Sequence, residues 1–219
     1  MRILRSASAL ALVAVAGCHS VGLAARGPSA DTRGWTTHRI EVGAHIVQFT
    51  IPPGESQAFR SFSIPTRVDL ADPDAFDEVL AGPVLLRRTW DYRESRFDAV
   101  DGSLSAGISV SRSNHPLESL DSLRAAVENA SELNQSKLLR EEGRRRASNK
   151  PVSFEAVKIA GRDAWKATYE LTGIRYVLPL DERHYLGISL RRNGISRLEW
   201  RVDAENAAKA ILESIRITP

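Results

Sequence analysis

Histidine is the residue type that most often serves as a general base or a zinc ligand near neutral pH. The chain contains five histidines, and no two of them lie at a metal-ligand spacing on one predicted element: His19, His38, His45, His115 and His184. His38, His45 and His184 lie in or beside predicted strands and could converge in space to form a zinc or catalytic cluster. Because the spacing places no Asp or Glu partner beside them, we expect imidazoles on a sheet surface instead.

The sequence motifs of the common enzyme classes are missing. The sequence contains no Gly-x-Ser-x-Gly segment of an α/β-type serine hydrolase and no His-Glu-x-x-His segment of a zinc enzyme. Gly102 and Gly107 come nearest to a phosphate-binding loop, but they lack the Lys and the hydroxyl residue that such a loop needs. We therefore expect no catalytic residue, no metal site and no cofactor, and a protein that is not an enzyme.

An acidic run in the first half of the chain suggests calcium binding at first sight. It consists of Asp69, Asp72, Asp74, Asp77 and Glu78. The EF-hand pattern fails at Phe76, where it requires an oxygen ligand, and at Asp77, where it requires Gly. We expect solvated carboxylates at the start of a capped helix, and the alternative is an acidic edge that docks a basic partner.

A basic cluster in the second half of the chain is the most distinctive polar feature. It consists of Lys137, Arg140, Arg144, Arg145, Arg146 and Lys150. Three consecutive arginines near a membrane could contact anionic lipid headgroups or the acidic surface of a protein partner. The alternative is a solvated helix end, where the positive charges complement the helix dipole.

Aromatic residues at strand spacing are usually part of the core. Trp90 and Tyr92 share one face of a predicted strand with Arg88, and Trp165 shares a face of another with Tyr169. An exposed Trp or Tyr beside arginines would instead be a candidate hot spot for protein binding. The candidate interface residues are therefore Trp90, Tyr92, Lys137, Arg140, Arg144, Arg145 and Arg146.

The N-terminus has the pattern of a secretory signal over residues 1–17. Arg2 and Arg5 precede an apolar run over residues 9–16, which is too short to span a bilayer comfortably. The run ends in Val-Ala-Gly before Cys18, and this segment resembles the bacterial lipobox. The resemblance implies that Cys18 becomes the acylated first residue of a mature lipoprotein.

The lipobox resemblance also implies a location. In Gram-negative lipoproteins an Asp after the acylated Cys commonly retains the protein at the inner membrane, and His19 stands there in this chain. We therefore expect a lipid anchor in the outer membrane, facing the periplasm, with two or three acyl chains that hold it stably. Residues 18–34 are rich in Gly, Ala, Ser and Pro and are expected to form a flexible tether, and residues 35–219 a single domain.

Charge and cysteine content exclude several classes of protein. The formal charge is +3, from 30 basic and 27 acidic residues, and without Arg2 and Arg5 the balance is 28 against 27, or +1. Nucleic acid is therefore not the expected partner. A single cysteine excludes a disulfide framework and a cysteine-rich zinc site, so core packing must hold the fold together.

Strand and helix signals alternate along the body. A short helix capped by Asp72 is predicted to end at Gly82-Pro83, a long helix begins at Pro116, and Asp203 is expected to cap a third. Asn193-Gly194 is the strongest hairpin signal. Hydrophobic alternation predicts strands over residues 37–42, 45–51, 84–93, 104–112, 152–159, 164–171, 175–180, 183–192, 195–202 and 214–217.

This order of elements predicts an α+β fold, with an antiparallel β-sheet sandwich, one long central helix and a C-terminal helix. Three segments carry a resemblance to the PsbP-like fold: Phe-Thr-Ile-Pro-Pro at 49–53, Ile-Ala-Gly-Arg-Asp-Ala-Trp at 159–165, and the closing residues 210–217. The resemblance implies a fold and no reaction. The lipobox, the tether and the strand-rich region 161–192 also resemble the lipoprotein immunity proteins that neutralise type VI secretion effectors.

Two classes of function follow. The first is a lipid-anchored periplasmic protein without catalytic activity that binds another protein, as an immunity protein would bind a secreted antibacterial effector. The second is an envelope lipoprotein that binds a ligand or a lipid in a pocket between sheet and helix. An exposed patch of aromatic and charged residues would favour the first, and an apolar cavity the second.

Overall fold

The computed structural model describes residues 27–56, 62–93, 99–142, 150–169, 172–194 and 198–219. They form an α+β fold with two mostly antiparallel sheets, as predicted in outline. The helices are α1 (Leu120–Glu142) and α2 (Leu198–Glu213), and neither is long and apolar enough to cross a bilayer. The strands are β1 (Thr36–Val42), β2 (His45–Ile51), β3 (Arg67–Val68), β4 (Ala81–Tyr92), β5 (Gly102–Arg112), β6 (Pro151–Ile159), β7 (Arg162–Tyr169), β8 (Gly173–Pro179), β9 (His184–Gly194) and β10 (Arg216–Thr218).

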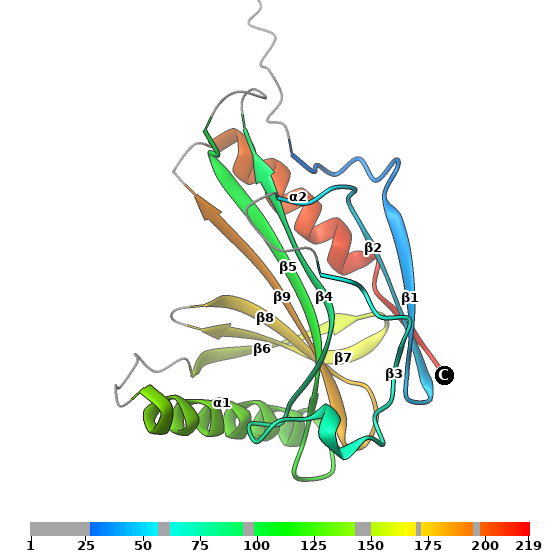
Figure 1. Cartoon of the computed structure of the whole chain (residues 1–219), viewed down its shortest axis with the longest axis vertical. Helices are drawn as coiled ribbons and strands as arrows, with labels where there is room; N and C mark the ends of the chain where they lie inside the picture. The colour runs from blue at the N-terminus through cyan, green and yellow to red at the C-terminus, as the bar shows by residue number, and fades with distance from the viewer. Residues whose placement is uncertain (1–26, 57–61, 94–98, 143–149, 170–171, 195–197) are drawn as a thin grey trace, which may run out of the picture.

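The larger sheet has six strands in the order β4-β5-β9-β8-β7-β6, and the smaller has four in the order β10-β2-β1-β3. Among the strands of the described residues, only β1 and β3 pair in parallel. The long central strands β5 and β9 pair from Gly102↔Gly194 to Arg112↔His184 without a register shift. Figure 1 shows α2 and the β1–β2 hairpin on one side of these strands and α1 on the other.

The main core lies between one face of the larger sheet, the smaller sheet and α2. Leu104, Ala106, Ile108 and Val110 of β5 are buried there, as their alternation with polar residues predicts. A second apolar cluster lies on the opposite face of the same sheet, where Leu123 and Val127 of α1 contact β7, β8 and β9. Both faces of the larger sheet are therefore covered, but α1 covers only part of one face.

Helix α1 begins four residues later than the sequence predicts. Pro116 lies before the helix, and Ser119 and Ser122 form a reciprocal cap in which each backbone N–H donates to the other hydroxyl, at 2.9 and 3.2 Å. The cap satisfies N–H groups that a helix start leaves without partners. Trp165 of β7 donates its indole N–H to the Leu120 carbonyl at 2.6 Å and fixes this end of α1 on the sheet.

The predicted hairpin at Asn193-Gly194 is wrong. Strand β9 ends there, and Trp200, predicted to lie in a returning strand, is buried in the first turns of α2. Trp200, Ala204, Ala207 and Ile211 recur at helical spacing and form one buried stripe against the main core. Asp203 therefore lies inside α2 and does not cap it, because the helical stripe begins before it.

The smaller predictions are confirmed in part. Asp72 accepts from the Asp74 N–H at 2.9 Å and caps a turn of 3-10 helix, Pro73–Ala75. Gly82 and Pro83 do not end that helix, because they lie in β4, where a register shift separates Ala81 from Val84. The turn between β6 and β7 consists of Ala160 and Gly161, both with positive φ, within the gap that the sequence leaves between the strands predicted over 152–159 and 164–171.

Candidate functional site

Alternation along β5 and β9 gives the larger sheet one polar face, which we call the serine face. On β5 it presents Ser105, Gly107, Ser109 and Ser111, and on β9 it presents Tyr185, Gly187, Ser189 and Arg191. The opposite face of the same strands is part of the main core. The hydrogen-bonding side chains are therefore held on the rigid centre of a sheet and not on loops.

Helix α1 closes one side of this face and leaves a pocket of about 510 Å³ between helix and strands. Val127, Ala130, Ser131 and Asn134 line it from α1, at the spacing that places them on one face of the helix. The opposite walls are formed by the start of β4 and by β5, β8 and β9. The volume lies within the usual range for small-molecule sites.

The described lining of the pocket is rich in hydrogen-bonding groups and contains no Asp or Glu. Among these described residues, two cations, Arg175 and Arg191, and the amide of Asn134 face the pocket, so the described lining carries positive charge. Seven of its residues carry hydroxyl groups: Ser109, Ser111, Ser131, Tyr169, Thr172, Tyr185 and Ser189. Apolar side chains also line the pocket, among them Val84, Val127 and Ile174, so it is mixed in character and not the purely apolar cavity that the sequence led us to expect for a lipid-handling protein.

Arg175 of β8 lies at the floor of the pocket. Its guanidinium covers the backbone of Gly187 on β9, in the place where any other residue would carry its Cβ. The Nη2 atom donates to Ser109 Oγ at 3.3 Å, and the buried Nε–H has no acceptor within the described part of the chain. A guanidinium with one weak neutral partner can bind a further acceptor.

Tyr185 stands beside this arginine with its hydroxyl protonated. Burial raises the pKa of Tyr185 above its ordinary value, against the opposing effects of Arg175 and of a hydrogen bond with Ser111. A protonated hydroxyl can donate to a ligand oxygen.

The predicted basic cluster is partly neutralised where the structure describes it. Glu78 forms ion pairs with Lys137 at 3.5 Å and with Arg140 at 3.2 Å, and Lys150 pairs with Glu132 at 2.7 Å. The two contacts of Glu78 join the loop before β4 to the second half of α1, beside the pocket, and the Lys150 contact joins the start of β6 to α1. Arg144, Arg145 and Arg146 lie outside the described residues.

Trp90 and Tyr92 are not available as exposed hot-spot residues. Their exposed fractions are 3% and 0%, so the core interpretation of these aromatics is confirmed. Tyr92 packs against Trp200 and donates its hydroxyl to the Pro28 carbonyl at 2.9 Å. Burial raises the pKa of Tyr92, so this hydroxyl stays a donor.

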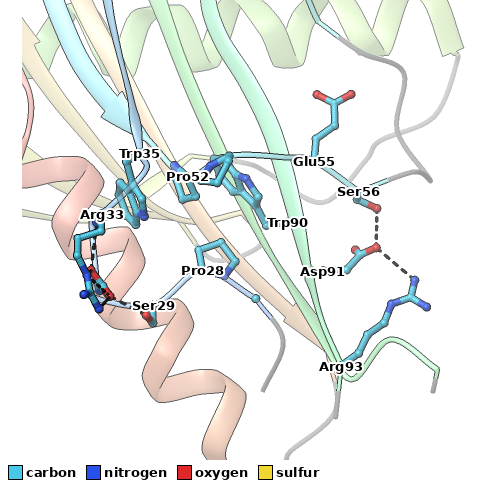
Figure 2. A pocket seen from close by; sticks show the side chains of 13 residues that line it. Pro28, Ser29, Arg33, Trp35, Pro52, Glu55, Ser56, Trp90, Asp91 and Arg93 are labelled. Carbon is cyan, nitrogen blue, oxygen red and sulfur yellow. Dashed lines mark hydrogen bonds and ion pairs between the residues drawn. The ribbon is translucent and has the colours of Figure 1, made fainter. Parts of the chain in front are cut away.

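A second cavity, of about 820 Å³, lies where the N-terminal segment meets the body. Figure 2 shows Trp35, Pro52 and Trp90 close together in it, with Pro28 below and Ser56 donating to Asp91 at 2.8 Å. The Tyr92 ring fills the space where a Cβ at Gly27 would lie. Gly27 and Pro28 of the predicted tether thus contact the body, which leaves residues 19–26 between Cys18 and this contact.

The three strand histidines do not form a cluster. His38 stacks on Phe49, His184 stacks on Phe76, and the described residues contain no group of three or more His, Cys, Asp or Glu that could hold a metal. Burial lowers the pKa of His38, with a smaller contribution from Arg88. His184, whose side chain is 13% exposed, is not the surface imidazole that the sequence led us to expect.

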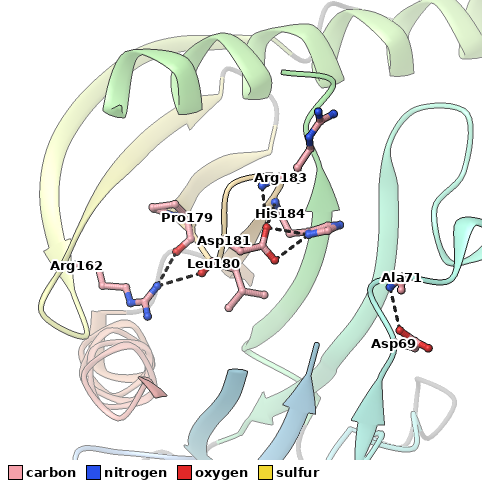
Figure 3. A network of polar contacts seen from close by, with 8 residues as sticks. All are labelled: Asp69, Ala71, Arg162, Pro179, Leu180, Asp181, Arg183 and His184. Atoms are coloured by element: carbon pink, nitrogen blue, oxygen red, sulfur yellow. Dashed lines mark hydrogen bonds and ion pairs between the residues drawn. The ribbon is translucent and has the colours of Figure 1, made fainter. Parts of the chain in front are cut away.

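His184 has a carboxylate partner that its spacing did not suggest. Figure 3 shows Asp181 in the β8–β9 turn, where it accepts from the backbone N–H groups of Arg183 and His184, both at 2.8 Å, and from the His184 ring at 2.9 Å. Burial alone would raise the pKa of Asp181, but these hydrogen bonds outweigh it and hold the pKa below the ordinary value. This network shapes the turn.

The acidic run acts on the backbone. Asp69, Asp72 and Asp77 accept from N–H groups two residues further on, at 2.9 to 3.0 Å, and Asp77 also accepts from Ala81. Carboxylates used in this way stabilise turns, and they do not converge on one point. The expectation of solvated and capping carboxylates is confirmed, although the capped helix is a single turn.

The sequence analysis missed Arg175 and Gly187. One signal was present: a lone Gly inside a strand often marks a close approach by another group. Cys18, the predicted lipidation site, lies outside the described residues. No family model, no curated protein and no solved structure matches this chain.

Proposed function

We propose that this protein is a lipid-anchored binding protein of the bacterial envelope that holds a small polar ligand between α1 and the serine face, without catalysing a reaction. The pocket of about 510 Å³ with its hydroxyl, amide and guanidinium lining carries the proposal. Polar groups that converge on one cavity from a rigid sheet are typical of ligand sites. Among the two classes expected from the sequence, this is the second, with a polar ligand in place of a lipid.

The lipobox supports the membrane part of the proposal. Cys18 would hold the protein at the outer membrane, and the body would face the periplasm. From Cys18 to the docked Gly27 the chain can span at most about 30 Å. The Gly102 end of the larger sheet would then lie nearest the membrane surface, and the pocket, toward the Ser111 end, would lie farther from it. The body itself is proposed to have the PsbP-like sandwich fold, on the segments that resemble it.

Native mass spectrometry of the full mature lipoprotein, extracted from its own membranes in mild detergent, tests the binding function. We expect a non-covalent small-molecule adduct. Ala130→Trp should remove the adduct because Ala130 lines the pocket and an indole would fill it. Ala125→Trp is the matched control, because Ala125 is exposed on the same helix.

Two outcomes of that experiment would contradict the proposal. One is an adduct that both tryptophan variants retain equally, which would place the ligand elsewhere. The other is a protein that carries no small molecule and is recovered in a stoichiometric complex with another protein.

A protein partner, such as a secreted effector that this chain neutralises, is the second candidate. One observation favours it: β6 is an outer strand of the larger sheet, and its Val152 is 65% exposed. An outer strand with an exposed apolar side chain can pair with a strand of another protein. Val152→Asp would weaken such a complex and leave the small-molecule adduct unchanged.

A further inference from the structure

The charge of Arg175 has no counter-charge within the described part of the chain. Its only hydrogen-bond acceptor there is the neutral Ser109 hydroxyl at 3.3 Å, and no described residue that lines the pocket carries a carboxylate. On α1, by contrast, Arg124 pairs with Glu128 and Arg140 with Glu78, while Arg162 donates to the carbonyls of Pro179 and Leu180. The buried Nε–H of Arg175 has no acceptor in the described part of the chain.

Gly187 lets this guanidinium lie flat against the backbone in the middle of the sheet. It is opposite Ser109 on β5 and opposite Val177 on β8, and a Cβ at 187 would overlap the Nη2, Nε and Cζ atoms of Arg175. Without a side chain at 187, the planar cation lies against the backbone with one face covered. The sheet thereby restricts its orientation, which favours planar recognition of an anion.

Hydroxyl groups line the pocket around the cation from three elements. Ser109 comes from β5, and Ser189 lies directly opposite Arg175 on β9. Ser131 faces the pocket from α1, where its hydroxyl donates to the Val127 carbonyl at 2.9 Å and its oxygen can accept. Arg191, also on β9, adds a second positive charge at the exposed side of the pocket. Such cations can bind the oxyanion of a ligand, and the neutral polar groups around them can hydrogen-bond to hydroxyl groups on the same ligand.

We propose that the pocket binds a small organic anion of about sugar size, with its carboxylate, phosphate or sulfate group against the guanidinium of Arg175. The inference rests on the proposed function, because it uses the same pocket, and it adds the chemical class of the ligand. The neutral part of that molecule lies along α1, within reach of Ser131 and Asn134.

Three matched probes test the class of ligand: glucose 6-phosphate, glucuronate and glucose. The full mature lipoprotein in detergent is titrated with each at constant ionic strength, and the thermal unfolding midpoint is recorded. Ligands that bind the folded protein raise this midpoint. We expect a saturable rise with glucose 6-phosphate, with glucuronate or with both, and none with glucose; the response to each anion distinguishes phosphate from carboxylate.

Substitutions of Arg175 test whether the rise in the unfolding midpoint depends on this residue. Arg175→Met should weaken the apparent affinity for the effective anion by about 10- to 100-fold, as expected for the loss of a charged hydrogen-bond partner. Arg175→Lys should recover part of it. Arg39→Met is the matched control, because it removes one exposed positive charge from the other sheet. Gly187→Ala is a second variant, which keeps the charge but displaces the guanidinium.

The outcomes separate this inference from the proposed function. If glucose raises the midpoint as much as the anions do, the pocket takes neutral ligands, and only the inference is overturned. If no anion raises it, or if Arg175→Met responds as the wild type does, the inference is also overturned. The adduct of the native protein and its loss in Ala130→Trp still decide the proposed function independently.

Discussion

At the scale of single residues, the pocket floor depends on one contact between neighbouring strands, that of Arg175 with the backbone of Gly187. Neither residue is conspicuous in the sequence. Because residue 187 has no Cβ, the guanidinium of Arg175 can lie against the backbone in the middle of the sheet. We therefore expect the effect on stability of substituting Gly187 to depend on which residue stands at position 175.

Gly187→Ala should lower the free energy of unfolding by about 0.5–1 kcal/mol, because the new methyl group overlaps the guanidinium and displaces this flexible side chain from its rotamer. In an Arg175→Ala background the same substitution should cost much less, since the space is then open. Urea unfolding of the four proteins in this double-mutant cycle measures the coupling. Equal costs in the two backgrounds would contradict the contact.

A second prediction at this scale concerns pH. The pKa of Asp181 is held below its ordinary value of 3.8, so its charged form stabilises the folded state above that pH, and the contribution is lost as pH falls through the folded pKa. Asp181→Asn keeps an oxygen acceptor for the turn and removes the charge. We expect the variant to be less stable than the wild type above about pH 5.

The gap in stability between these two proteins should close as the pH falls below the ordinary Asp range. Denaturant unfolding at a series of pH values measures it. A gap that stays constant down to acid pH would show that the charge of Asp181 does not stabilise the turn.

At the scale of elements, the position of α1 decides whether a pocket exists. The Ser119 and Ser122 cap and the Trp165 hydrogen bond fix its first turn, and only the first half of the helix packs on the second apolar cluster. The second half is held to the loop before β4 by the pairs of Glu78. The pocket lies between these two attachments.

Ser119→Ala should reduce the free energy of unfolding by about 1 kcal/mol, because the Ser122 N–H loses its acceptor. Ser136→Ala, at an exposed position inside the same helix, should be neutral or slightly stabilising, since Ala is the better helix former. Chemical denaturation of both variants provides the comparison. An equal effect of the two substitutions would argue against the cap.

The elements also show what the sequence could predict. The polar and apolar alternation of β5 correctly indicated one buried and one wet face, because that information is local. The strand predicted over residues 195–202 is wrong from Leu198 on, where α2 begins, because Trp200 and Ala204 form a stripe at helical spacing against the core; residues 195–197 lie outside the described part. The pocket could not be predicted, because it depends on which strand lies beside which.

At the scale of the whole molecule, the N-terminal segment joins the body to its expected anchor. Pro28 accepts from Tyr92 and Gly27 packs on its ring, at the end of the larger sheet where Trp200 also lies. A short chain from Cys18 would therefore hold this end of the body nearest the membrane. The contact of the N-terminal segment with Tyr92 would then set both the anchoring of the body and its orientation relative to the membrane.

Cys18→Ser should abolish incorporation of labelled palmitate and leave residues 1–17 attached, because the lipoprotein processing reaction requires the modified cysteine. Ser20→Ala, two residues away, should be labelled and processed as the wild type is. Metabolic labelling and the intact mass of each protein give the result. A labelled Cys18→Ser protein would show that the lipobox interpretation is wrong.

The electron density between α1 and the serine face, in crystals of the mature protein isolated from its own membranes, shows whether this space is a binding site. We expect connected density for a small molecule, in contact with the guanidinium of Arg175. Density for ordered water alone, with a bound ligand or protein elsewhere on the molecule, would contradict this expectation.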